Sequence, residues 1–264
     1  MPDLVESLKC PRCGGPITMN PGDVIVTCPY CGSASRLRSE KAFLLRHGML
    51  TARLDEAGAA AAIEAWFSGG FLKPSDLRRG SRIASLECVY IPFFVFEVDV
   101  TTTYAGILTR TGTNDRRTGT VPRDYFWKVL GRRGDDFPTR EYKLPLGYKV
   151  PFDTAGMVRA SRFLNAEFDE EEAERIARQE VTSHERELLK DVVDVVEDAR
   201  TETVVKDAEF LHAPVWLARY TYRDREFRII LDGASGEIVR GDIPPPTGGL
   251  REFIKDAGRS VFGG

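Results

Sequence analysis

The strongest strand signal in this 264-residue chain is the run Val89-Tyr90-Ile91-Pro92-Phe93-Phe94-Val95-Phe96-Glu97-Val98-Asp99-Val100. Its first half is apolar at every position, which is typical of a strand that is buried on both faces. From Phe94 onward, apolar residues alternate with the acids Glu97 and Asp99, so we expect one face to meet water. The run therefore predicts a strand that enters a hydrophobic core and then leaves one face exposed.

A second run repeats this pattern: His212-Ala213-Pro214-Val215-Trp216-Leu217-Ala218-Arg219-Tyr220-Thr221-Tyr222. Aligning Pro92 with Pro214 matches apolar positions with apolar positions and polar with polar. The matched pairs are Phe94 with Trp216, Val98 with Tyr220 and Val100 with Tyr222. We interpret the repeat as an internal duplication of one strand-led unit. The alternative is two unrelated strands that each begin near a proline.

Composition places the chain among globular proteins without a strong electrostatic field. The net charge is −3, with 42% hydrophobic and 29% charged residues. A charge this small does not draw the whole protein to nucleic acid. No apolar run is long enough for a membrane-spanning helix, and the first residues lack the basic flank and apolar core of a signal peptide. We therefore expect a cytoplasmic protein without a transmembrane segment.

Four of the five cysteines form two Cys-x-x-Cys pairs, Cys10 with Cys13 and Cys28 with Cys31. Two thiolates at this spacing lie on one tight turn, and two such turns complete a tetrahedral shell for one zinc ion. A shell of four sulfurs leaves no open position, so the zinc is expected to be structural. The alternatives are a redox dithiol pair or unrelated cysteines. Cys88 precedes a buried strand and is expected to pack as a small hydrophobic residue, not to bind metal.

The pattern of elements predicts an α+β fold with three parts and a tail. A zinc ribbon at residues 1–36 precedes two related antiparallel β units, each with a packed helix, at residues 50–150 and 152–244. Asp55 is expected to cap the helix of the first unit, and residues 104–111 to form a return strand. A long acidic helix at 169–200 leads the second unit, although its last valines favour a strand.

An amphipathic stretch at residues 247–264 follows three prolines. Its apolar residues recur at helical spacing, with charged residues on the opposite side. We expect it to form a helix on a protein partner or in a homo-oligomer. A frayed tail and a peripheral contact with a membrane surface are the alternatives.

The cysteine pairs, the run Tyr90–Val100 and the segment Pro214-Val215-Trp216-Leu217 together resemble a known family. This is the family of bacterial and archaeal transcription-factor-B-type zinc-ribbon proteins, and the likeness extends from about Cys10 to Pro246. Some members are labelled primosomal or replication-restart helicase-like, and others resemble a membrane-stress protein that partners a flotillin-like scaffold. The resemblance implies a zinc ribbon and a scaffold assembly. The sequence has neither the phosphate-binding motif of a helicase nor the transmembrane helices of the membrane-stress protein.

These observations favour a non-enzymatic zinc-ribbon adaptor that mediates protein–protein interaction. The sequence contains no recognisable nucleophile motif, and its three histidines are scattered. The alternative is nucleic-acid binding through the ribbon. Residues 1–50 carry six Lys or Arg and four Asp or Glu, and a zinc ion with four thiolates contributes −2, so this segment is nearly neutral. Such a surface attracts phosphate weakly.

Overall fold

The computed structural model describes residues 8–20, 22–36, 46–70, 73–110, 112–133 and 137–245. Over these residues the fold is mixed α and β with sheet predominating, as the sequence predicts. The chain divides into two compact units, each assembled from three segments. Unit 1 comprises residues 1–47, 92–133 and 165–211, and unit 2 comprises residues 48–91, 134–164 and 212–264. The predicted tail at 247–264 lies outside the described residues.

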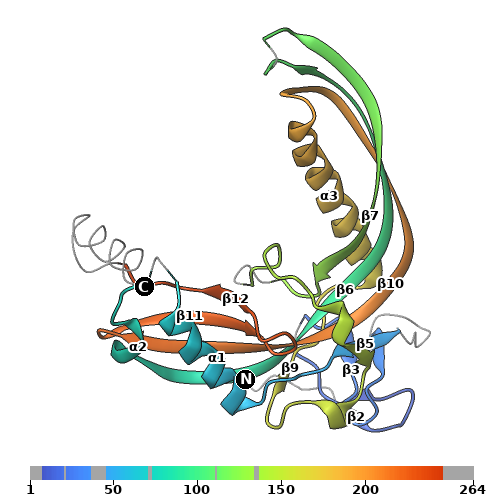
Figure 1. Ribbon diagram of the computed structural model, residues 1–264. Coiled ribbons are helices and arrows are strands. Elements are labelled where there is room, and N and C mark those ends of the chain that lie inside the picture. Colours follow the sequence, from blue (N-terminus) through green and yellow to red (C-terminus); the bar gives the residue numbers. More distant parts are fainter. Residues whose placement is uncertain are drawn as a thin grey trace. The chain divides into compact units, whose positions relative to one another are not determined.

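Unit 1 is built on a long antiparallel hairpin (Figure 1). Strand β6 (Ser81–Leu108) enters the unit at Pro92 and pairs with β7 (Asp115–Leu130), from Phe93 opposite Leu130 to Leu108 opposite Asp115. Strand β10 (Val195–Tyr222) also pairs with β6. The prediction of a return strand at 104–111 was therefore wrong. That segment mostly continues β6, because its residues from Tyr104 to Leu108 pair with β7 from Gly119 to Asp115.

Helix α3 (Glu170–Leu188) packs on β7 and buries Ala173, Ala177 and Val181, which the helical spacing predicts. The Asp169 side chain caps it by accepting a hydrogen bond from the Glu172 amide at 2.9 Å. The helix predicted to extend to residue 200 ends at Leu188 and is followed by η3 (Leu189–Asp191). Strand β10 begins at Val195, because the β-branched valines after the helix favour an extended backbone.

The core of unit 1 joins one face of the β6–β7 hairpin to α3 and to the segment before it. Its buried members are Ile25, Ala34, Phe94, Phe96, Val98, Val100, Val129, Ala166, Phe168, Ala173, Ala177, Val181 and Phe210. The alternating residues Phe94, Phe96 and Val98 all point into this core, as predicted for the inward face of the strand.

A charged side chain lies within the contact between α3 and the hairpin. The Glu185 side chain is fully buried and accepts hydrogen bonds from Arg123 Nη1 at 2.6 Å and from Thr102 Oγ1 at 2.9 Å. The Tyr125 hydroxyl also donates to it, and burial together with Glu185 raises the pKa of Tyr125. A buried carboxylate is tolerated when it is paired and hydrogen-bonded in this way. The network fixes which face of α3 meets the hairpin.

Unit 2 is also built on an antiparallel hairpin with a packed helix (Figure 1). Strand β10 enters the unit at His212 and pairs with β11 (Arg225–Asp232), which pairs with β12 (Ile238–Gly241). Helix α1 (Glu56–Ser68) contacts β11 and is capped by Asp55, as predicted.

The other elements of unit 2 surround this hairpin. They are β5 (His47–Leu50, entering the unit at Gly48), α2 (Leu77–Gly80), η1 (Leu146–Tyr148), β8 (Lys149–Pro151), η2 (Thr154–Gly156) and β9 (Arg162–Phe163). Strand β5 pairs with β8 in antiparallel orientation, and β9 pairs with β6 in parallel. No helix among the described residues has the length and apolar character needed to cross a membrane.

The core of unit 2 contains the second half of the sequence repeat. Its buried members are Met49, Ala59, Ile63, Phe67, Leu77, Cys88, Tyr90, Trp216, Ala218, Tyr220, Tyr222, Ile229 and Leu231. Both Phe94 and Trp216, at 1% and 3% exposed, are buried in the core of their own unit. The division into interleaved units differs from the consecutive units expected at 50–150 and 152–244.

Each hairpin has its own contact between a proline and a glycine, at equivalent positions. The Gly131 amide donates to the Pro92 carbonyl at 2.8 Å, and the Gly233 amide donates to the Pro214 carbonyl at 2.9 Å. A Cβ atom on Gly131 would lie 3.2 Å from the Pro92 carbonyl oxygen, and one on Gly233 would lie 3.0 Å from that of Pro214. Glycine at both positions permits this close approach of two backbones.

Truncating either aligned aromatic should destabilise the protein strongly. We expect Phe94→Ala and Trp216→Ala each to lower the free energy of unfolding by about 3–5 kcal/mol, because each leaves a cavity in a packed core. Denaturant unfolding at equilibrium measures the loss. Phe126→Ala is the control, since that side chain is 66% exposed and its loss should be nearly neutral. Equal stabilities for all three variants would contradict the assignment of the two cores.

Candidate metal centre

The two cysteine pairs lie on matching turns at the ends of two short hairpins. Strand β1 (Leu8–Lys9) pairs with β2 (Pro16–Ile17), and β3 (Ile25–Thr27) pairs with β4 (Ala34–Arg36). In the first turn, the amide of Gly14 donates to the Cys10 carbonyl at 2.8 Å; in the second, Gly32 donates to Cys28 at 2.9 Å. Gly14 and Gly32 have φ of 75° and 70°, which side chains disfavour, as the sequence predicts.

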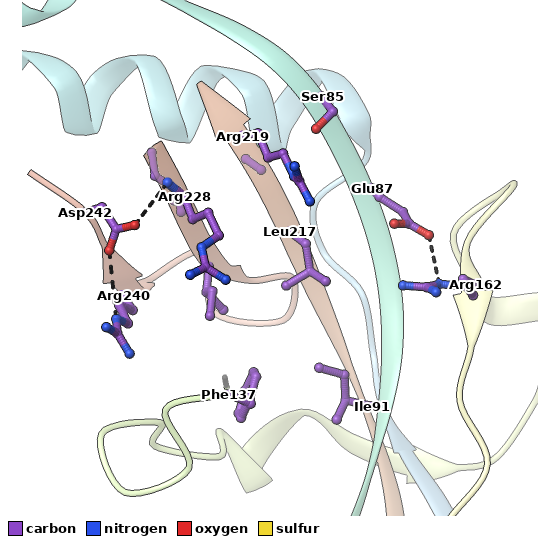
Figure 2. A pocket seen from close by; sticks show the side chains of 13 residues that line it. Ser85, Glu87, Ile91, Phe137, Arg162, Leu217, Arg219, Arg228, Arg240 and Asp242 are labelled. Carbon is purple, nitrogen blue, oxygen red and sulfur yellow. Dashed lines mark hydrogen bonds and ion pairs between the residues drawn. The ribbon is translucent and has the colours of Figure 1, made fainter. Parts of the chain in front are cut away.

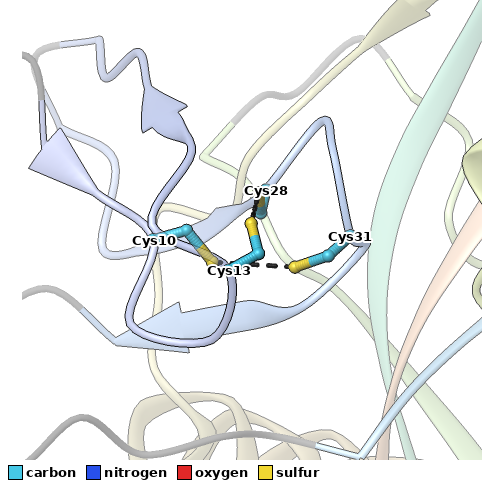
Figure 3. Close-up of side chains that lie close together, drawn as sticks. All are labelled: Cys10, Cys13, Cys28 and Cys31. Atoms are coloured by element: carbon cyan, nitrogen blue, oxygen red, sulfur yellow. Dashed lines mark hydrogen bonds between the residues drawn. The ribbon is translucent and has the colours of Figure 1, made fainter.

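These turns bring together the sulfur atoms of all four predicted ligands, Cys10, Cys13, Cys28 and Cys31 (Figure 3). The four Sγ atoms lie within 4.8 Å of one another. The shortest separations are 3.6 Å between Cys10 and Cys31 and 3.7 Å between Cys13 and Cys28. Zn–S bonds of about 2.3 Å in a tetrahedron place sulfurs about 3.8 Å apart, so the cluster has the size of one four-coordinate metal site.

The surroundings of the sulfurs also suit a metal thiolate. Ser33 Oγ lies 3.2 Å from the sulfurs of both Cys10 and Cys31. Burial raises the pKa of the Cys10 thiol, but hydrogen bonds from Ser33 and from the backbone outweigh this and lower the pKa to about 6. Burial raises the pKa of Cys28 to about 12. A bound metal ion would hold all four sulfurs as thiolates, because coordination deprotonates a thiol.

The ribbon is attached to the rest of unit 1 by specific contacts. Ile25 forms a β-bridge with Ala166, and the amide of Thr27 donates to Asn165 Oδ1 at 3.2 Å. Arg36 pairs with Asp169, the residue that caps α3. The metal turns are therefore held against the start of α3, and they do not extend from unit 1 as an independent module.

His47 connects the second metal turn to the core of unit 1. Its Nδ1 lies 2.8 Å from the Gly32 carbonyl oxygen, and its ring lies 5.1 Å from the Phe210 ring. Burial lowers the pKa of His47 to about 4, against the opposing effect of the Gly32 carbonyl. Neither Ser33 nor His47 stands at a ligand spacing in the sequence, so neither was predicted to lie at the site. Only the folded turns place them beside the cysteines.

The remaining candidates from the sequence are not members of the sulfur cluster. Cys88 is buried in the core of unit 2, as expected for a packed thiol. His184 lies against the rings of Tyr125 and Trp127, and His212 stacks on Phe163. All five cysteines are free thiols. The arrangement thus provides one closed set of four sulfur ligands.

Replacing one ligand should release the metal. We expect the wild-type protein to contain one zinc per chain and Cys28→Ser to contain none, because three sulfurs hold zinc much more weakly than four. Loss of metal should expose residues 8–36 to limited proteolysis while unit 2 stays folded. Metal analysis and protease mapping measure both effects. Cys88→Ala is the control and should keep the metal. No zinc, or two zinc ions, in the wild type would contradict the site.

The buried His47 should make stability depend on pH. Its pKa is about 4 in the folded protein and about 6.5 unfolded, so the unfolded chain binds the extra proton between these values. Stability is therefore complete above about pH 6.5 and falls, by up to about 3 kcal/mol, as the pH drops toward 4. In His47→Asn the asparagine amide can occupy the Nδ1 position, but it does not titrate. The loss of stability between pH 6.5 and 4 that comes from His47 should therefore vanish in this variant. Denaturant unfolding of both chains in excess zinc at pH 7.5 and 5 tests it, and identical pH dependence would contradict the argument.

Comparison with known proteins identifies no relative. No family model, no curated protein and no solved structure matches the chain.

Proposed function

We propose that this protein is a non-enzymatic adaptor in which one structural zinc ion shapes a surface for another protein. The observation that carries the proposal is the closed set of four sulfurs at Cys10, Cys13, Cys28 and Cys31. A metal with four protein ligands offers no open position to a substrate or to water, so its role is to hold the two turns. The resemblance to transcription-factor-B-type zinc-ribbon proteins supports the choice of zinc.

An aromatic side chain on the ribbon supports protein binding. Tyr30 lies within the second metal turn and is 63% exposed. Its ring also contacts the first turn, since a Cβ atom on Gly15 would lie 2.7 Å from Tyr30 Cδ2. The ring is thus held in place while most of its surface faces outward. Ordered, exposed aromatic residues are typical anchors of protein interfaces.

Strands of unit 1 carry further exposed apolar side chains. Phe126 on β7 is 66% exposed and Val204 on β10 is 61% exposed. The inward faces of the same two strands fill the core with Val129 and Phe210, so the outward apolar residues do not contribute to it. They provide a second contact surface for a protein partner or for another copy of this chain. We place such an assembly in the cytoplasm. Its partner there would be a scaffold protein, as for the membrane-stress protein that some members of the family resemble.

Nucleic-acid binding is the second candidate, and the exposed ring of Tyr30 favours it as well. An exposed aromatic ring can stack on a base of single-stranded nucleic acid. Phosphate contact needs an accompanying excess of positive charge, and residues 1–50 with the metal are nearly neutral. We therefore rank it below the adaptor.

We also infer that the two units derive from one duplicated segment whose helices exchanged partners. Helix α1 precedes β6 in the chain but contacts β11, whereas α3 precedes β10 but contacts β7. The residue two positions before each helix cap donates its amide to the carbonyl of the glycine in the proline–glycine contact. Before α1, Arg53 donates to Gly233 at 2.9 Å, and before α3, Glu167 donates to Gly131 at 2.7 Å. This correspondence, together with the shared proline–glycine contact, supports one ancestral helix-and-hairpin unit.

The experiment uses the purified full chain, loaded with zinc, as bait in native lysate. We expect a stoichiometric partner, identified by mass spectrometry, to be retained by the wild type and lost by Tyr30→Ser. Tyr148→Ser is the matched control, because Tyr148 is a partly exposed tyrosine of unit 2. Sedimentation of the same chains tests self-association.

A gel-shift series with single-stranded DNA and RNA across salt concentrations separates the two candidates. Binding that depends on Tyr30 and weakens steeply with salt, without any protein partner, would replace the adaptor proposal by the nucleic-acid one. Partner binding that Tyr30→Ser leaves intact would remove the role assigned to the ribbon.

A further inference from the structure

Unit 2 contains a groove of about 440 Å³ on the face of its sheet opposite α1 (Figure 2). Even-numbered residues of β6 and β10, such as Tyr90 and Trp216, point into the core with α1. Their odd-numbered neighbours Ile91, Leu217 and Arg219 therefore point to the other face and line the groove. Phe137, from the segment after β7, also lines it. The groove is thus built from several strands and one connecting segment.

Apolar and basic side chains are arranged in order along this groove. On β10 and β11, Leu217 lies opposite Ile230, and the next pair on the same face is Arg219 opposite Arg228. Figure 2 shows Leu217 in the middle of the groove, with Ile91 and Phe137 below it. Arg219 lies above Leu217 in this view, and Arg228 lies to its left. An apolar floor therefore leads directly to a pair of guanidinium groups.

The lining has an excess of positive charge, although the chain as a whole is acidic. Four arginines line it, Arg162, Arg219, Arg228 and Arg240, against the two acids Glu87 and Asp242. Like charges directly opposite each other on neighbouring strands, as at Arg219 and Arg228, repel. This repulsion is relieved when an anion lies between the two guanidinium groups.

The ion pairs that Arg162, Arg219 and Arg240 make are on the surface and can exchange for a ligand. Arg219 lies 2.9 Å from Glu226, with the two side chains 62% and 51% exposed. Arg240 lies 4.0 Å from Asp242, also in an exposed position. Exposed pairs of this kind hold their partners weakly. A phosphate or carboxylate group can instead bind two guanidinium groups in fork geometry.

We propose that this groove binds a small amphiphile that has one anionic head and an apolar chain. Its volume is that of a small-molecule site, and small-molecule sites combine an apolar lining with a few placed charges in this way. The head binds between Arg219 and Arg228, and the chain lies over Leu217, Ile230, Ile91 and Phe137. The proposal concerns unit 2 alone and is independent of the metal centre.

Calorimetric titration of the zinc-loaded full chain with decyl phosphate, below the concentration at which it forms micelles, tests the proposal. We expect one site per chain. Octyl phosphate should bind more weakly, by up to about fifteenfold, because each methylene removed loses up to about fourfold. Inorganic phosphate and decyltrimethylammonium should bind negligibly. Decanoate tests whether the head must be a phosphate, and its binding at the same site would support the shared anionic chemistry.

Variants locate the site. Arg219→Gln combined with Arg228→Gln should weaken decyl phosphate binding by at least about tenfold, because charged hydrogen bonds are lost. Arg117→Gln combined with Arg200→Gln, two exposed arginines of unit 1, is the matched control and should bind like the wild type. Circular dichroism and zinc content verify that each variant is folded. Equal binding by both double variants, or tight binding of decyltrimethylammonium, would overturn the proposal, and so would equal affinity for phosphate alone.

Discussion

Each of the two longest strands supplies side chains to two hydrophobic cores. Strand β6 contributes Tyr90 to unit 2 and Phe94 to unit 1, and β10 contributes Phe210 to unit 1 and Trp216 to unit 2. This dual use explains why the centre of each strand is apolar on successive residues, since both of its faces must be covered there. The interleaving of segments in the two units follows from it. Any change that breaks one of these strands would disturb both cores.

A metal ion at the four cysteines would stabilise a segment that is too small to fold alone. Among the described residues, the hydrophobic cluster inside the ribbon has four buried members, and two of them are the predicted ligands Cys10 and Cys28. So little apolar surface cannot offset the entropy of ordering two short hairpins, and a metal ion with four thiolates can. The ribbon then serves unit 1 as well, because Arg36 reaches the capping residue of α3.

Charge acts locally in this protein and not through a global field. The net charge of −3 conceals a fully buried carboxylate at Glu185, which Arg123 neutralises, and a basic groove in unit 2. The first fixes how α3 meets its hairpin. The groove is open to solvent, and its arginines do not pack in the core of unit 2. These two clusters show why composition alone predicts little about binding: the position of a charge decides its role.

Some features were predictable from the sequence because they depend on neighbouring residues only. The cysteine spacing predicts two turns, Asp55 and Asp169 predict helix starts, and the repeated run predicts two strands with matching buried faces. Other features depend on partners far away in the chain. The extension of β6 to Leu108 and the choice of hairpin for each helix follow from tertiary packing. The same holds for Ser33, His47 and the arginines of the groove. Ser33 and His47 meet the metal turns only in the folded protein, and the groove gathers arginines from four different strands, which local spacing does not encode.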